Sequence, residues 1–296
     1  MTLTRPIPLW LLRIAWVALP LTAGPAASAA LRDWSDAPRL VTEILLWLAW
    51  AAGLLATIAP RPVALTALRT IAPAFFVLAV VAAFSGEPST AATVAVLVTT
   101  AITAFVASGH DIALASANAA AYGDELRVPL RVPPTLFLAP LPLARALVVV
   151  GVAAGPLLLA DDRIVLGLVA LLVGVPVAVV LAGALHRLSR RWAVLVPAGF
   201  VVVDPMTLAD NVLFPREGIA GMQAADATRA APDVLDLRLG ASLGSVLLSF
   251  DQLAELFRAG RGRRPTETVK TSHLLIAVVR RDEMLHLAKS RRLRVD

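Results

Sequence analysis

The chain has 296 residues, of which 58% are hydrophobic and only 16% are charged, and its mean hydropathy is +0.78. Soluble domains usually contain about half apolar and about a quarter charged residues, so this composition excludes an ordinary soluble globular protein. The chain contains no cysteine, which excludes disulfides, thiolate metal ligands and cysteine nucleophiles.

Charge is distributed unevenly along the chain. Residues 1–185 hold ten arginines against nine acids, whereas the remaining residues hold seventeen lysines and arginines against twelve acids. A nearly neutral apolar part followed by a basic part is typical of a membrane domain joined to a soluble one. The sequence therefore predicts a transmembrane domain over residues 1–187 and a cytoplasmic domain over residues 188–296.

Six apolar segments of the first part are long enough to cross a membrane as helices, which takes roughly 20 residues each. They are residues 8–30, 40–59, 63–84, 90–108, 136–160 and 164–185. Eight arginines flank one set of their ends, whereas three flank the opposite set. By the positive-inside rule, this excess predicts a multi-pass protein of the plasma membrane with both termini in the cytoplasm.

The first apolar segment has a second interpretation. Arg5 and Arg13 precede an apolar stretch, and Ala27-Ser28-Ala29 has the small residues of a signal-peptide cleavage site. Cleavage there would leave five spans and an external N-terminus, with the C-terminus still in the cytoplasm. Whether residues 1–30 are a span or a cleaved signal peptide stays open at this point.

The longest break between the predicted spans is the loop of residues 109–135. Its Ala-rich piece, residues 112–121, is compatible with a short helix, and its Pro-rich end cannot continue one. The mixed charge predicts a structured loop that lies against the soluble domain or the lipid headgroups.

One histidine and three carboxylates of this loop offer ligand atoms for a divalent cation, but their spacing fits no known metal pattern. We interpret them as loop caps and expect no metal and no cofactor; they are His110, Asp111, Asp124 and Glu125.

Arg145 is the candidate intramembrane charge, about ten residues into the fifth apolar segment, where a charge costs at least about 2.5 kcal/mol. Such a charge indicates a functional site by default, with Glu43 or a backbone carbonyl as its partner. The alternative is that Pro140 and Pro142 delay the span until Leu143, so that Arg145 snorkels to the membrane interface. We favour this second interpretation.

After Arg190 the pattern changes to short β-branched runs that predict strands. Pro197-Ala198-Gly199 separates two such runs, residues 192–196 and 200–204, and predicts a hairpin. Residues 234–239 alternate apolar and polar side chains and are expected to pair back with residues 245–250 across a glycine turn. The other expected strands are residues 211–214, 219–223 and 269–279.

Two segments near the C-terminus complete this part. Residues 252–258 form either a short helical turn or an extension of the preceding strand. Residues 282–292 predict a terminal helix, because acids come first and basic residues come last, as the helix macrodipole prefers. Its packed stripe is expected to be Met284, Leu285 and Ala288.

The segment of residues 191–210, RWAVLVPAGFVVVDPMTLAD, resembles the opening hairpin of bacterial pleckstrin-homology-like (PH-like) domains in membrane proteins of actinobacterial type. The resemblance covers only the last third of the chain. It implies that the cytoplasmic part is a PH-like β-barrel with a C-terminal helix. Together with the apolar segments, the expected fold is a membrane α-helical bundle of about six transmembrane helices followed by this barrel. The resemblance also implies an interaction role, and it transfers no catalytic residue.

Clustered arginines of the last third are the candidate lipid- or partner-binding residues. Near an anionic membrane surface each is worth about 1 kcal/mol of attraction. Aromatic residues are scarce and no nucleic-acid recognition motif occurs, so nucleic acid is not an expected partner. The candidates are Arg261, Arg263, Arg264, Arg280, Arg281, Arg291 and Arg292.

The sequence contains no phosphate-binding Gly-Lys-Ser/Thr loop, no paired-histidine helix and no nucleophile elbow. We therefore expect a non-enzymatic, membrane-anchored scaffold or interaction protein, whose cytoplasmic domain binds a protein partner or anionic lipid headgroups, in a process such as cell-envelope assembly. The alternative is a transporter or an accessory subunit of one.

Overall fold

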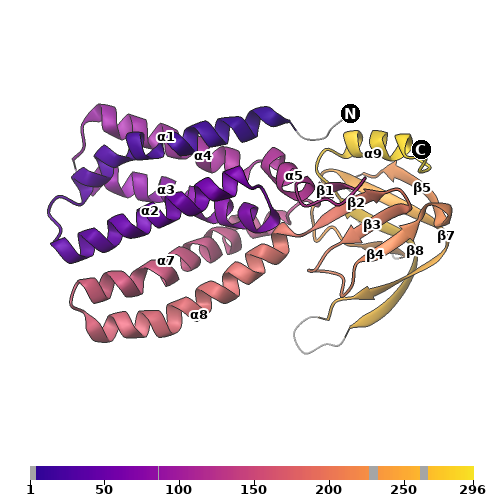
Figure 1. The fold of residues 1–296 in the computed structure, drawn as a ribbon. Coiled ribbons are helices and arrows are strands. Elements are labelled where there is room, and N and C mark those ends of the chain that lie inside the picture. Colours follow the sequence, from indigo (N-terminus) through magenta and orange to yellow (C-terminus); the bar gives the residue numbers. More distant parts are fainter. Residues whose placement is uncertain (1–4, 86, 227–232, 261–265) are drawn as a thin grey trace. The chain divides into compact units, whose positions relative to one another are not determined.

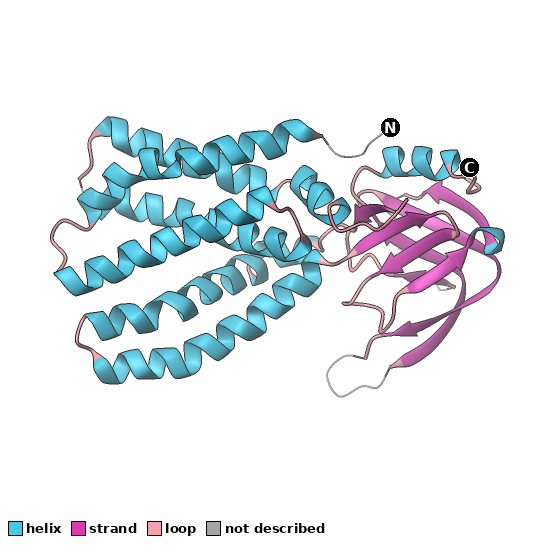
Figure 2. Ribbon diagram, in the orientation of Figure 1, coloured by secondary structure: helices cyan, strands magenta, loops and turns pink. Residues whose placement is uncertain are grey.

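The computed structural model describes residues 5–85, 87–226, 233–260 and 266–296. They form two compact units. The helical unit comprises Arg5–Ser116 and Leu141–His186, and the sheet unit comprises Ala117–Pro140 and Arg187–Asp296. Figure 2 shows that the strands belong to the second unit. The sheet unit thus includes a segment of the loop between the fourth and fifth predicted spans, a loop that the sequence analysis placed in the part before residue 188.

Six helices of the described residues are long and apolar enough to cross a membrane, which confirms the prediction of a multi-pass membrane protein. Large apolar side chains such as Phe84, Phe105 and Leu172 are more than three-quarters exposed on these helices, as expected for surfaces that face lipid. The six are α1 (Pro6–Ala30), α2 (Asp36–Ile58), α3 (Pro62–Ser85), α4 (Thr90–Ser108), α7 (Pro140–Ala160) and α8 (Ile164–Ser189). The short helices α5 (His110–Asn118) and α6 (Pro134–Leu138) lie between α4 and α7.

The core of the helical unit lies where α1, α3 and α4 pack together around the buried side chains of Leu12, Trp16 and Leu68. Trp16 and Trp50 each donate an indole N–H to the other's backbone carbonyl, at 2.9 and 3.0 Å. A Cβ at Gly53 would lie 1.8 Å from the Trp16 ring, so only glycine allows this approach of α2 to α1. These contacts fix α1 and α2 against each other.

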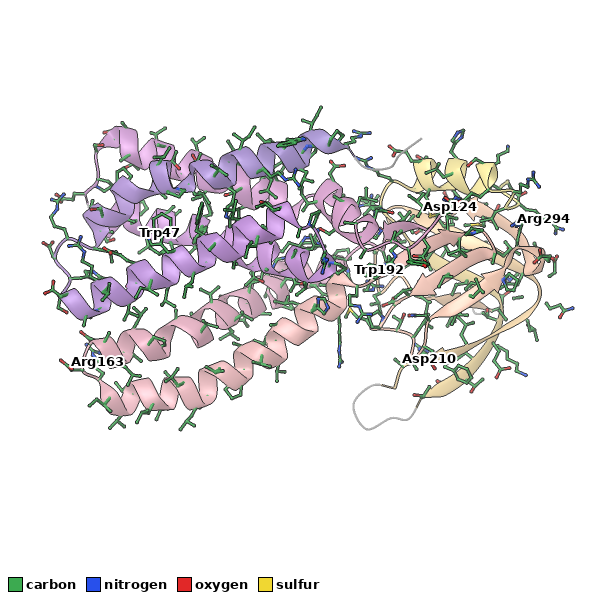
Figure 3. All side chains as sticks on the ribbon, viewed as in Figure 1. Trp47, Asp124, Arg163, Trp192, Asp210 and Arg294 are labelled. Atoms are coloured by element: carbon green, nitrogen blue, oxygen red, sulfur yellow. The ribbon has the colours of Figure 1, made fainter. Side chains whose placement is uncertain are left out.

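Helices α7 and α8 form a hairpin (Figure 1). Glycines lie where the two helices approach each other. A Cβ at Gly151 would lie 2.4 Å from the Gly174 carbonyl oxygen, and a Cβ at Gly155 would lie 2.5 Å from the Leu171 side chain. Small residues four apart let membrane helices approach closely and gain dispersion contacts without a hydrophobic driving force. Figure 3 labels Arg163 at the turn between these two helices.

The first sheet of the sheet unit has the order β1-β2-β3-β4, with every neighbouring pair antiparallel. The predicted hairpin is confirmed, because Val196 pairs with Gly199 across Pro197 and Ala198. A Cβ at Gly199 would lie 2.2 Å from the Phe214 carbonyl oxygen, which explains the glycine. The strands are β1 (Leu126–Pro129), β2 (Trp192–Val196), β3 (Gly199–Val203) and β4 (Val212–Pro215).

Strand β1 comes from the loop between α4 and α7, about sixty residues before β2 in the chain, and lies beside β2 (Figure 1). Its Val128 is completely buried. This confirms the prediction that the loop is structured and lies against the C-terminal domain. The loop contributes an outer strand to the first sheet.

The second sheet has the order β5-β7-β8-β6. Residues 252–258 extend the long strand β7, which decides between the two predicted alternatives, although the β7–β8 register shifts between Ser249 and Ala254. The predicted terminal helix is α9 (Arg281–Ser290), and its stripe of Met284, Leu285 and Ala288 is buried as expected. The strands are β5 (Ile219–Ala224), β6 (Val234–Asp236), β7 (Ser245–Arg258) and β8 (Glu267–Ala277).

The predicted pairing of residues 234–239 with residues 245–250 is wrong. Strand β6 ends at Asp236 and pairs in parallel with β8, not with β7. The Asp236 carboxylate accepts hydrogen bonds from the backbone N–H and the guanidinium of Arg238, and Leu239 has a φ of 54°. This local turn ends the strand before the alternating pattern ends, because a side chain bonded to nearby backbone competes with the strand ladder.

Strand-like contacts join the two sheets without closing them into one. At one edge, which we call the closed seam, Pro129–Arg131 pairs with Ala277–Val279 through two backbone hydrogen bonds of 2.8 and 3.0 Å. At the other edge Thr207–Ala209 pairs with Phe257–Ala259, also through two backbone hydrogen bonds, of 2.9 and 2.8 Å. The sheet unit is therefore a pair of four-stranded sheets with a final helix. The described strands form no closed sheet, so the predicted PH-like β-barrel is not confirmed.

Candidate functional site

The two sheets leave a gap between β4 and the second half of β7, which we call the open seam. Strand β4 is the outer strand of the first sheet, and among the strands that the structure describes it pairs only with β3. Strand β5 pairs with β7 only up to Phe250, so the stretch Asp251–Leu256 of β7 has no β5 partner. The 3₁₀ turn η1 (Arg216–Gly218) links β4 to β5 at one end of the seam, and the Leu208–Arg258 bridge lies at the other.

A groove of about 420 Å³ occupies the open seam. Its volume lies within the roughly 300–1,000 Å³ of typical ligand sites. Phe214 and Phe250 stack beneath it, with ring centroids 4.6 Å apart, while Leu213 is 49% exposed. The groove therefore has a packed aromatic floor and an accessible apolar rim. It is lined by Val212–Pro215, Glu217, Gly218, Phe250–Gln252, Ala254 and Glu255.

Backbone groups of β4 point into the open seam. The N–H of Arg216 donates to the carbonyl of Ala198 at 3.0 Å, so this pair belongs to the hydrogen-bonded set of the β3–β4 ladder. Bonded and non-bonded pairs alternate along an antiparallel ladder, so Phe214 is bonded to β3 and Leu213 is not. The N–H and the carbonyl of Leu213 consequently point away from β3, toward the outer edge of the sheet.

The described lining of the groove is acidic, with three carboxylates and no basic residue. Asp251 pairs with Arg294 at 3.6 Å and Glu255 pairs with Lys270 at 3.8 Å, and these four side chains are 45% to 64% exposed. Exposed pairs of this kind contribute only about 0–1 kcal/mol and exchange partners easily. Glu217 is exposed and forms no ion pair within the described residues. The chain as a whole has a net charge of +6, so this acidic groove differs in sign from the rest of the molecule.

The arginines predicted to bind lipid do not form one free basic patch in the described part of the sheet unit. Arg280 pairs with Glu283 and Arg281 with Asp282 on α9. Arg291 donates to the carbonyls of Asp124 and Leu195 and to the Asp124 carboxylate. Arg292 is exposed. The remaining candidates, Arg261, Arg263 and Arg264, lie outside the described residues.

The loop residues that sequence analysis considered as metal ligands are not brought together. His110 and Asp111 begin α5, whereas Asp124 pairs with Arg291 and Glu125 pairs with Arg127. Within the described ranges, no group of three or more histidine, aspartate or glutamate side chains is arranged to hold a metal ion.

Arg145 lies five residues after Pro140, where α7 begins. The helix thus starts later than the predicted residue 136 but earlier than Leu143, because Pro140 and Pro142 fit within the first turn, where a proline loses no hydrogen bond. The side chain of Arg145 is half-buried.

Sequence analysis missed a buried ion pair. Arg191 donates two hydrogen bonds of 2.8 Å to the Asp204 carboxylate, and the two side chains are 1% and 0% exposed. Arg191 also donates to the carbonyls of Arg131 and Leu237, so its guanidinium joins the two sheets. The predicted hairpin could have revealed this ion pair. Its register pairs Trp192 with Val203, which places the oppositely charged residues 191 and 204 next to each other.

Comparison of the chain with protein-family models, with curated protein sequences and with solved structures finds no match.

Proposed function

We propose that the protein is a non-enzymatic, membrane-anchored interaction protein whose sheet unit binds an extended segment of a protein partner in the groove of the open seam. In this proposal the sheet unit is a PH-like module with an unclosed edge, and it lies with both chain termini on the cytoplasmic side. The single observation that carries the proposal is the coincidence of an unpaired strand edge with an apolar, acidic groove.

Strand addition explains why these features occur together. A partner segment that runs along β4 would accept a hydrogen bond from the Leu213 N–H and donate one to the Leu213 carbonyl. Its alternate side chains would contact the Phe214–Phe250 stack. An exposed outer strand is otherwise a risk for unspecific pairing, and β4 is only four residues long, which limits that risk.

The charges of the groove select the kind of partner. Glu217, Asp251 and Glu255 favour a segment that carries lysine or arginine next to its apolar residues. The same carboxylates repel anionic headgroups, so a protein segment fits the groove better than a lipid surface does. The internal ion pairs of Arg280, Arg281 and Arg291 further favour a protein partner for this unit.

A displayed random peptide library, selected against the full-length protein in detergent, tests this proposal. We expect the selected peptides to alternate apolar with lysine or arginine residues and to lack proline. The variant Glu217→Lys/Glu255→Lys should bind them at least roughly tenfold more weakly, because two favourable charge pairs become repulsive.

The matched control is Asp226→Lys, an exposed acid of the sheet unit outside the groove lining, which should bind the peptides as the wild type does. Selected peptides without basic residues, or equal binding by all three proteins, would contradict a cation-selective groove. Loss of binding in the control alone would place the partner site elsewhere.

A further inference from the structure

The segment that follows α9 lies along β5, the outer strand of the second sheet (Figure 1). The N–H of Met222 donates to the carbonyl of Arg294 at 2.9 Å, and the N–H of Asp296 donates to the carbonyl of Met222 at 3.0 Å. Val295 is thereby bridged in parallel to Met222. Residues 294–296, which we call the edge segment, are thus a short strand that the chain adds to its own sheet.

The turn after α9 sets the direction of the edge segment. The N–H of Arg292, a residue with a φ of 64°, donates to the Lys289 carbonyl, and the N–H of Leu293 donates to the Ala288 carbonyl. These two bonds form a Schellman motif, which ends a helix and redirects the chain. Leu293 is 5% exposed, so its side chain fixes the turn to the core. Beyond Leu293 two backbone hydrogen bonds hold the edge segment, which can therefore leave β5 by local opening, without unfolding of the sheet.

The edge segment brings a cation to the groove of the open seam. The Nη1 of Arg294, labelled in Figure 3, lies 3.6 Å from the Oδ2 of Asp251, which lines the groove. Both side chains are exposed, so the pair can exchange partners. Residues 292–295 read Arg-Leu-Arg-Val, which is the alternation of basic and apolar residues expected of a partner segment. The chain therefore carries its own cation at a position that a partner's lysine or arginine would occupy.

We propose that the edge segment regulates the groove by competing with the partner for Asp251. While the segment lies on β5, Arg294 offsets one of the three carboxylates that attract a cationic partner. When the segment leaves, Asp251 becomes free and the groove binds such a partner more tightly. By thermodynamic linkage, a bound cationic partner in turn weakens the hold of β5 on the segment. This inference rests on the proposed function, because it requires a groove that binds a cationic segment.

Binding of a blocked synthetic peptide in which lysine and valine alternate tests this regulation, with the full-length protein in detergent. Arg294→Gln removes the competing cation and should bind the peptide about threefold to fivefold more tightly than the wild type does. The matched control is Arg292→Gln, which removes the same charge from an exposed neighbour outside the groove lining. It should bind the peptide as the wild type does.

A double-mutant cycle with Asp251 tests whether the two groups act on each other. Asp251→Asn in the wild type should change peptide affinity little, because Arg294 already offsets this carboxylate. In the Arg294→Gln background the same substitution should remove the whole gain in affinity. Equal effects of Asp251→Asn in both backgrounds would contradict competition for this carboxylate.

A backbone variant releases the edge segment and leaves Arg294 in place. Asp296→Pro removes the N–H that donates to Met222 and should give part of the same gain in affinity. Asp296→Asn removes the same charge, keeps the N–H and should give no gain. Hydrogen exchange of the Met222 amide, which donates to Arg294, should become faster in Asp296→Pro and in the wild type with bound peptide. An unchanged Met222 amide in both cases would show that the segment stays on β5.

The outcomes separate the regulation from the binding site itself. If the wild type binds the peptide, and Arg294→Gln and Arg292→Gln bind it equally tightly, the regulation is overturned and the groove remains the partner site. If neither the wild type nor Arg294→Gln binds it, the proposed function fails and the regulation fails with it. Binding by Arg294→Gln alone would support the regulation, with an edge segment that closes the groove completely.

Discussion

At the closed seam of the sheet unit, Pro129–Arg131 bonds to Ala277–Val279, and the Arg191 guanidinium meets four acceptor atoms beneath them. At the open seam, Thr207–Ala209 bonds to Phe257–Ala259 at one end, but the outer edge of β4 has no strand partner among the described residues. The carboxylates beside it form only long, exposed ion pairs. Both seams join the same two sheets. The polar groups buried at the closed seam all form hydrogen bonds, because a buried polar group without a hydrogen bond lowers the stability of the fold. Polar groups at the open seam are in contact with water, so they need no partner within the protein and remain available to another molecule.

The two outer strands of the first sheet, β1 and β4, should therefore respond very differently to the same substitution. Val128→Asp places an unpaired carboxylate at a fully buried position and should destabilise the sheet unit by more than about 4 kcal/mol. Leu213→Asp, at a half-exposed position of β4, should change its stability by less than about 1 kcal/mol. Hydrogen exchange of the β2 and β3 amides in the full-length protein measures both effects. Similar losses for the two variants would show that the seams do not differ.

Breaking an ion pair at each seam should give a smaller difference in stability between the two seams. Arg191→Met leaves the buried Asp204 carboxylate uncompensated and should cost about 3–5 kcal/mol. Adding Asp204→Leu should recover most of that loss, because the unpaired charge is then removed. Lys270→Met, which breaks the exposed pair with Glu255, should cost at most about 1 kcal/mol. The same exchange measurement compares the three proteins, and a large cost for Lys270→Met would contradict the view that the groove carboxylates are available to a partner.

Local patterns in the sequence predicted much of the fold. The long apolar segments predicted the six helices, Pro197-Ala198-Gly199 predicted the hairpin, and the amphipathic stripe predicted α9. These features depend on periodicity and turn chemistry within one segment, so they can be read without knowledge of the rest of the chain.

The remaining features depend on contacts between distant segments. Strand β1 has four residues in a Pro-rich loop and becomes a strand only because β2 pairs with it. Strand β6 ends early because the Asp236 side chain turns back onto Arg238. The groove depends on the shift in the β7–β8 register, and no residue type or pattern within Ser245–Arg258 predicts that shift. A single sequence does not reveal which edge of a pair of sheets stays open.

Amide hydrogen exchange at neighbouring residues of β4 tests the central claim most directly. The Leu213 N–H points into the open seam, whereas the Phe214 N–H is already bonded to β3. A selected cationic peptide bound to the full-length protein should slow exchange at Leu213 at least roughly tenfold, since its amide gains a hydrogen bond, and should leave Phe214 nearly unchanged. Equal protection of both amides, or bound peptide without protection at Leu213, would contradict strand addition at the open seam.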